Sequence, residues 1–199
     1  MTSKLIVNSI RHTGASADAI TMDASGNVTF PANATCSGTA TGFGGGITEA
    51  DLFQLTADVT ASTATDLGTN WARPNTANDG FGKIGTGMSF SGAIWTFPST
   101  GIYHVIFNAM IYANGSNGTT QFQILATEDN STYAAQSSAH VSVSNGYFGS
   151  VCPTALIDVT NTTNVKVKFR AATSSSNQLV GSNTAVGLTY VSFIRLGDT

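Results

Sequence analysis

The sequence predicts an all-β fold, a jelly-roll sandwich preceded by a short N-terminal β-hairpin segment. Short stretches of alternating apolar and polar residues recur along the chain, separated by turns rich in Asn, Ser and Gly. Charged residues make up only 10% of the 199 residues, against roughly 25% in an average globular protein. The sequence also lacks the long runs of Glu, Lys, Arg and Leu that amphipathic helices need.

The first 45 residues have a different character from the rest of the chain. Residues 4–10 form a candidate strand, and residues 19–31 form a candidate hairpin that turns at residues 24–27. Because an isolated hairpin is marginal in water, we expect this segment to wind together with identical copies around a common axis. An ordinary hairpin at the edge of the main domain is the alternative. Cys36 lies in a run of small residues, where three copies could meet on such an axis.

A glycine-rich stretch separates this segment from the main domain. Residues 42–46 contain four glycines in five positions, which predicts a linker because glycine loses the most entropy on ordering. The expected division is therefore a segment 1–45 for attachment and trimerisation, and a head 46–199. Residues 47–53 are compatible with a single helical turn, with Thr48 as its N-cap.

The head reads as strand after strand. The candidate strands are 52–59, 82–90, 93–97, 101–112, 119–128, 138–143, 146–158, 164–171 and 186–196. Eight or more strands in roughly 145 residues are typical of a jelly roll. Residues 102–107 of the strand 101–112 contain one polar residue, so we expect this strand to be buried on both faces, with Tyr103 and Phe107 pointing to the same side.

Composition argues against nucleic acid and membranes as partners. The formal net charge is −3, and the one basic cluster, residues 166–170, alternates as the solvent face of a strand would. The longest apolar runs are too short to span a bilayer, which argues against membrane insertion. The first residues lack the apolar core of a signal peptide, so no targeting segment is predicted.

Signals for catalysis and cofactors are weak. His12, His104 and His140 lie in separate segments, and no hydrolase, phosphate-loop or zinc-protease motif occurs. We therefore predict a protein that is not an enzyme and needs no cofactor. Residues 128–130 offer oxygen ligands for calcium, but three adjacent side chains cannot all face one ion, and a solvated turn is the favoured interpretation. Cys152 is expected to be a small buried apolar group, and no disulfide framework is predicted.

Residues 97–107 resemble the core of the C1q and tumour-necrosis-factor (TNF) superfamily, which has an aromatic residue, Pro, and then Gly-x-Tyr-x-hydrophobic-x-aromatic. Residues 150–169 resemble the paired late strands of that family, and residues 189–196 resemble its closing strand. The usual ending Phe-Ser-Gly-Phe-Leu is replaced by residues 193–197, which favours a viral or bacterial branch. The resemblance implies a jelly roll that trimerises and whose role is binding.

Residues 3–31 are similar to the N-terminal attachment segment of tailed-phage fibre proteins, in the order strand, gap, strand, Ser-Gly-Asn turn and terminal Pro. This second resemblance implies a homotrimeric virion fibre protein, assembled in the bacterial host cytoplasm and joined to other virion proteins through residues 1–45. Its head would adhere to a host surface glycan or protein. Two alternatives stay open: a capsid or tail decoration protein, and a free soluble C1q-like lectin module.

The predicted receptor contacts lie in turns rich in Asn, Ser, Gly and Tyr. Such turns offer adaptable hydrogen bonds and flat aromatic surfaces with little charge, which suits neutral sugars or polar protein epitopes. The alternative is that they are merely soluble turns. The candidate residues are Asn114, Asn117, Asn130, Tyr133, Asn145, Tyr147, Phe148, Ser175 and Asn177.

Overall fold

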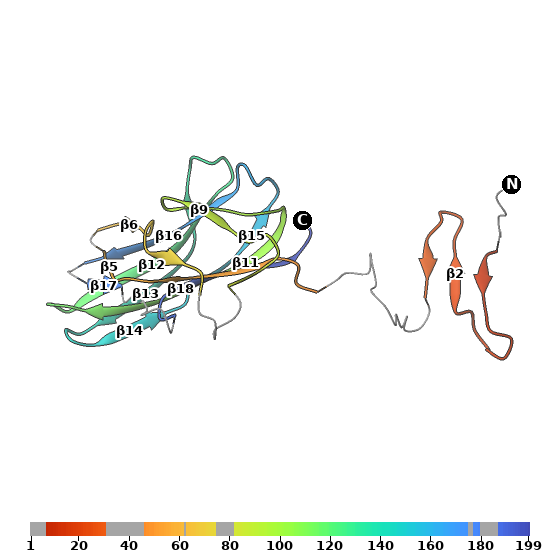
Figure 1. The fold of residues 1–199 in the computed structure, drawn as a ribbon, viewed down its shortest axis with the longest axis horizontal. Coiled ribbons are helices and arrows are strands. Elements are labelled where there is room, and N and C mark those ends of the chain that lie inside the picture. Colours follow the sequence, from red (N-terminus) through yellow and green to blue (C-terminus); the bar gives the residue numbers. More distant parts are fainter. Residues whose placement is uncertain (1–6, 31–45, 62, 75–81, 175–176, 180–186) are drawn as a thin grey trace. The chain divides into compact units, whose positions relative to one another are not determined.

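The fold is all-β in the residues that the computed structural model describes (Figure 1). The described residues are 7–30, 46–61, 63–74, 82–174, 177–179 and 187–199. The chain divides into two compact units, Met1–Gly45 and Gly46–Thr199. Within the described ranges, no helix is long and apolar enough to cross a membrane. Cys36 and Ser175 lie outside these ranges.

The first unit is a three-stranded antiparallel sheet. Its strands are β1 (Ser9–Ile10), β2 (Ile20–Met22) and β3 (Val28–Thr29), in the order β1-β2-β3. The turn between β2 and β3 is held by Asp23, whose Oδ1 accepts the backbone N–H groups of Ser25 and Asn27 at 2.9 Å each. Gly26 provides the left-handed backbone of this turn, with φ of 86°. The turn therefore forms where the sequence predicts it.

The second unit is a sandwich of two antiparallel sheets. The strands of the six-stranded sheet are β6 (Thr65–Asp66), β9 (Ser89–Ser91), β10 (Ile94–Thr96), β12 (Gly118–Thr127), β13 (Ala134–Val143) and β16 (Lys166–Thr173). Their order is β13-β12-β16-β10-β9, and β6 also pairs with β16.

The nine-stranded sheet contains the longest strand of the unit. Its strands are β4 (Ala50–Leu55), β5 (Val59–Ala61), β7 (Trp71–Ala72), β8 (Lys83–Ile84), β11 (Gly101–Ala113), β14 (Phe148–Val151), β15 (Thr154–Val159), β17 (Asn177–Leu179) and β18 (Tyr190–Gly197). The main path is β5-β17-β11-β18-β4-β7, with β14 and β15 beside β11 and β8 beside β4.

Aromatic side chains fill the space between the two sheets. Trp95 is fully buried and stacks on Phe90 with ring centroids 4.6 Å apart, while Phe53 meets it edge-on at 4.6 Å. Tyr103 and Phe107 of β11 both point into this core, which confirms that they share a face. The core therefore joins β4, β9, β10 and β11 through ring contacts rather than through aliphatic packing alone.

Three local expectations are wrong. Strand β11 is buried on one face only, because the six-stranded sheet covers its inner side and leaves Ile102 36% exposed on the outer side. The helical turn expected at residues 47–53 is absent: strand β4 begins at Ala50 and pairs with β18, so sheet pairing outweighs the weak capping pattern. Cys152 is exposed rather than buried, beside Pro153, where the strand expected over 146–158 breaks into β14 and β15.

A buried ion pair fastens the segment before β9 to strand β4. The Asp51 carboxylate is almost fully buried and accepts Arg73 Nε at 2.8 Å and Nη2 at 2.7 Å. The backbone N–H of Met88 donates to the same carboxylate at 2.6 Å, and Arg73 Nη2 donates to the Met88 carbonyl at 2.8 Å. The hydrogen bonds to Asp51 raise the pKa of Arg73 above its usual value. These contacts satisfy the buried carboxylate of Asp51, pair it with the partly exposed guanidinium of Arg73 and fix this loop against the sheet.

Candidate functional site

The two outer faces of the sandwich differ in chemistry. Large apolar side chains are exposed on the nine-stranded sheet, where Leu156 of β15 is 66% and Leu196 of β18 is 60% exposed. Ile102 of β11 and Ile84 of β8 add to this surface. Within the described residues, the six-stranded sheet exposes no large apolar side chain. An apolar surface on one face alone is typical of an interaction site.

The apolar surface is centred on strand β11. His104 faces outward between its sheet partners Leu156 and Ile194. A shallow depression of about 520 Å³ lies here, lined in part by His104, Leu156 and Leu196. This region is close to the start of β4, where the chain enters the second unit, and we call it the proximal end of the sandwich. The distal end is where β11 ends and β12 begins.

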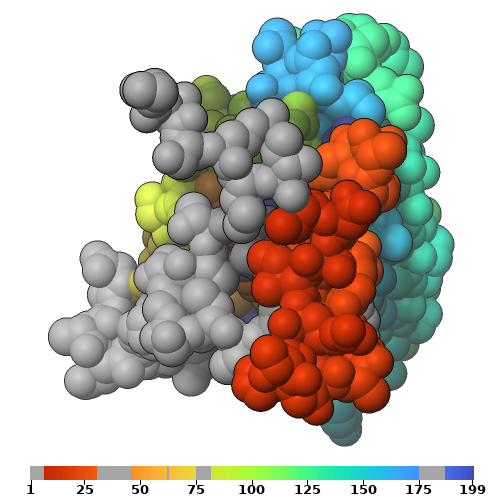
Figure 2. Space-filling view, turned by 90° about the vertical axis from the view of Figure 1, so that its right-hand side faces the viewer, coloured from red at the N-terminus to blue at the C-terminus, as the bar shows by residue number. Residues whose placement is uncertain are grey.

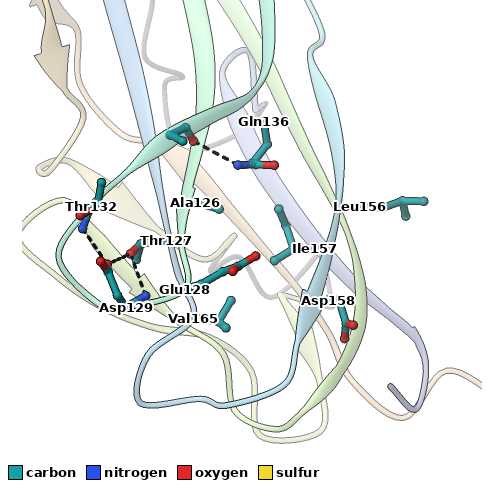
Figure 3. A pocket seen from close by; sticks show the side chains of 11 residues that line it. Ala126, Thr127, Glu128, Asp129, Thr132, Gln136, Leu156, Ile157, Asp158 and Val165 are labelled. Carbon is teal, nitrogen blue, oxygen red and sulfur yellow. Dashed lines mark hydrogen bonds between the residues drawn. The ribbon is translucent and has the colours of Figure 1, made fainter.

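A groove of about 730 Å³ runs along the sandwich edge between β13 and β15 at the proximal end (Figure 3). Glu128 and Ile157 point toward each other across it, and Leu156 points away toward the outside (Figure 3). Its lining also includes Val165, Gln136 and Asp158, so the groove combines apolar side chains with acidic and amide groups. The groove adjoins the apolar surface, because Leu156 borders both depressions.

The predicted contact turns that contain Asn114 and Asn117 and that contain Asn145, Tyr147 and Phe148 meet at the distal end. Asn145 Oδ1 accepts the backbone N–H of Gly115 at 2.9 Å, and the N–H of Asn145 donates to Asn117 Oδ1 at 2.8 Å. Ser174 joins the group, since its Oγ accepts the N–H of Thr119 at 3.2 Å. The side chains of Asn117 and Asn145 are thus used to hold the loops together. They position the distal surface, while Asn114 is exposed next to them.

An exposed aromatic pair lies beside these loops. Tyr147 is 68% exposed and Phe148 is 62% exposed, and the Phe148 ring packs on Tyr112 with centroids 4.9 Å apart. The backbone N–H of Ala113 donates to the Tyr147 carbonyl at 3.1 Å, which fixes the aromatic turn to the end of β11. The distal end therefore offers flat ring surface and amide groups together. Asn177 is in β17, next to the end of β11.

The predicted contact turn that contains Asn130 and Tyr133 lies at the proximal end, because it follows the opposite end of strand β12. Asn130 is exposed there with a left-handed backbone, φ 59°. Tyr133 is half-buried, with Lys168 Nζ 4.1 Å from its ring centroid and its hydroxyl shielded from solvent. Burial raises the pKa of Tyr133, with smaller contributions from Asp66 and Asp129. Tyr133 thus belongs to a separate surface from Tyr147.

Residues 128–130, the candidate calcium ligands, lie in a hydrogen-bonded turn. Asp129 Oδ1 accepts the N–H of Thr132 at 2.7 Å and of Ser131 at 2.8 Å, together with the Thr127 hydroxyl at 2.7 Å. These hydrogen bonds, the one from Thr132 first, lower the pKa of Asp129. In the described part of the chain, no group of three His, Cys, Asp or Glu side chains could hold a metal ion.

Comparison with known structures identifies the architecture. The chain is similar to the Eiger TNF of S. frugiperda, with a TM-score of 0.55 and 12% identity over 75% of this chain and 93% of that one. It is also similar to murine APRIL at pH 5.0, with a TM-score of 0.51 and 12% identity over 74% and 98% of the two chains. The fold is a TNF-like jelly roll. This agrees with the resemblance of residues 97–107. No protein-family model and no curated protein matches the sequence.

Sequence reasoning missed the apolar outer surface. The sequence pattern places Ile102, Leu156 and Leu196 in strands but does not distinguish them from the core residues around them. One feature of the sequence does indicate this surface. In β11 the residues that alternate with the core residues, among them Ile102 and Ile106, are also largely apolar. A strand that is apolar in both phases suits either complete burial within one chain or burial against another chain.

Proposed function

We propose that this protein is a homotrimeric, non-enzymatic binding protein, and that it serves as a phage virion fibre protein whose head adheres to the bacterial host surface. The observation that carries the trimer is the apolar outer face of the nine-stranded sheet, on which Leu156 and Leu196 are exposed in the single chain. A TNF-like jelly roll supports the same assembly. The support for a virion location is the pattern of residues 3–31.

The assembly surface suits a closed ring of three copies. The apolar face and the groove that adjoins it are different surfaces of one chain, so the face of one copy can meet the edge of the next. Contacts of this heterologous kind close into a ring when the rotation permits it. Leu156 borders both surfaces, so its substitution is expected to disturb the proposed interface from either side.

Light scattering of the Leu156→Asp variant tests the trimer. Leu156 is 66% exposed in the single chain, so the change should leave the fold of the head intact while placing a charge in the interface. We expect the parent to be trimeric and the variant to dissociate. The control is Ser138→Asp on the exposed outer face of β13, which should stay trimeric. A parent that is monomeric at micromolar concentration would contradict the proposal.

Adhesion is assigned to the distal end of the head. The chain enters the head at the proximal end. If residues 1–45 attach the protein to a particle, the distal loops are the part of the head that lies furthest from this entry point. Asn114, Tyr147 and Phe148 present amide and ring groups there with no charge. This chemistry favours neutral sugars or polar protein epitopes.

Adsorption of particles to host cells tests the adhesive role. The double variant Tyr147→Ala with Phe148→Ala removes the exposed rings and should reduce adsorption, whereas His140→Ala on the polar face of β13 should not. Unchanged adsorption with an intact fold would favour the decoration role. Immunogold labelling then separates the candidates, since a fibre lies at the tail tip, a decoration protein on the shell or along the tail, and a free lectin module on neither.

A further inference from the structure

We infer that the three-stranded sheet of the first unit is one wall of an intermolecular core, formed with the same sheet of two further copies. The starting observation is burial. Among residues 7–30 no side chain is buried, although the sheet is regular and its turn is fully hydrogen-bonded. In the space-filling view these residues form a narrow band of red and orange atoms (Figure 2). A sheet of this size has no core of its own.

The two faces of this sheet are chemically opposite. The register pairs Ile10 with Ile20 and Met22 with Val28, so these four apolar side chains share one face. Phe30 follows β3 in the same alternation and is exposed. The opposite face carries Ser9, Thr21 and Thr29, which are aligned across the three strands. The first face is therefore uncharged and mostly apolar, with Asn8 opposite Met22 as its polar member. The strand residues of the other face carry hydroxyl groups that water can solvate.

Further copies of the chain are the occupants that suit this face, and this step rests on the proposed trimer. A trimeric head tethers three such sheets to one another and raises their effective concentration. Among residues 7–30, this face contains no charged side chain, so identical faces meet without repulsion. The charged residues lie at the turns instead, where Arg11 and Asp18 approach within 3.8 Å and Asp23 caps its turn. Three apolar faces directed at a common axis would leave the three hydroxyl faces in water.

Cysteine labelling of the full-length trimer tests which face is covered. In a background of Cys36→Ser and Cys152→Ser, Met22→Cys places a thiol on the apolar face and Thr21→Cys places one on the hydroxyl face of the same strand. We expect iodoacetamide to react at least about tenfold more slowly at residue 22 than at residue 21, because access to the thiol controls its reactivity. Equal rates in a protein that light scattering shows to be trimeric would overturn the inference while leaving the trimeric head intact.

A distance measurement identifies what covers the face. A spin label on Thr21→Cys lies on the hydroxyl face and does not disturb the proposed core. If three sheets share a core, the spin labels of the three copies should give one narrow distribution of interchain distances in pulsed electron paramagnetic resonance. A protected residue 22 with a broad distance distribution would mean that the face is covered within each chain, which contradicts the inference. A monomeric parent would instead contradict the proposed function itself.

Discussion

Replacing Phe107 by Ala gives the most direct measure of how the sandwich is held together. Phe107 is fully buried on β11, and its ring lies 5.7 Å from Phe122 and 5.1 Å from Phe169. These two rings belong to β12 and β16 of the opposite sheet, so the change opens a cavity between the sheets. Such a substitution costs about 3–5 kcal/mol, which lowers the folding equilibrium constant by about 2–3.5 orders of magnitude.

Chemical denaturation followed by tryptophan fluorescence measures this loss. Trp95 packs 5.9 Å from Phe169 in the same aromatic core, so its emission reports on the packing that Phe107 supports. Parent and variant must be compared at one protein concentration, because association adds to the apparent stability. The matched control is Phe148→Ala, the same chemical deletion at a ring that is 62% exposed.

The control distinguishes the effect of burial on stability from the effect of removing any aromatic ring. Phe148 contacts Tyr112, and an aromatic contact of this kind contributes about 0.5–1.5 kcal/mol, so its removal should cost no more than that. The reasoning is refuted if Phe107→Ala lies within about 1 kcal/mol of the parent, because full burial between two sheets predicts a larger cavity penalty.

Three further outcomes are expected. The Asp51→Ala change should cost about 1–3 kcal/mol in denaturation, because it leaves the buried N–H of Met88 without its acceptor and the partly exposed Arg73 guanidinium without its carboxylate; a loss under about 0.5 kcal/mol would argue that these contacts do not stabilise the fold. Deletion of residues 1–45 should leave a head with an unchanged β-type circular dichroism spectrum, since the two units are separately compact. The Asp129 pKa is lowered in the fold, so its carboxylate stabilises the protein above the unfolded pKa of about 3.9, and this contribution is lost as the pH falls through the lower folded value. Asp129→Asn should therefore flatten the acid limb of the pH–stability curve, and an unaltered acid limb would show that the turn does not contribute.

The strand pattern of the head could be predicted because local and tertiary preferences agree there. The turn clusters at residues 114–117 and 144–147 end strands where expected, and the alternation around Tyr103 and Phe107 identifies the core face. The predicted strand boundaries are wrong where a single residue interrupts a regular alternation. Pro153 is the clearest case, since it lacks an N–H for the sheet and divides the expected strand 146–158 into two.

The grouping of the candidate loops could not be predicted from the sequence. Asn130 and Tyr133 have the same composition signal as Asn145 and Tyr147, yet they lie at opposite ends of strand β12. Which turns share an end depends on strand order and direction, and these follow from long-range pairing. Composition also gave no means of telling a ring covered by a neighbouring cation, as at Tyr133, from one open to solvent, as at Tyr147.

The outer face of β11 shows why an apolar strand does not establish burial within its own chain. Both phases of β11 are largely apolar, and the sequence alone favours a strand covered on both sides. The chain covers only the face of β11 that contains Phe107, and it leaves the face that contains Ile102 partly exposed. The first unit repeats this pattern, because its sheet has one mostly apolar face and no side chain of residues 7–30 is buried. In the trimer that we propose, identical chains would cover both of these apolar surfaces at once.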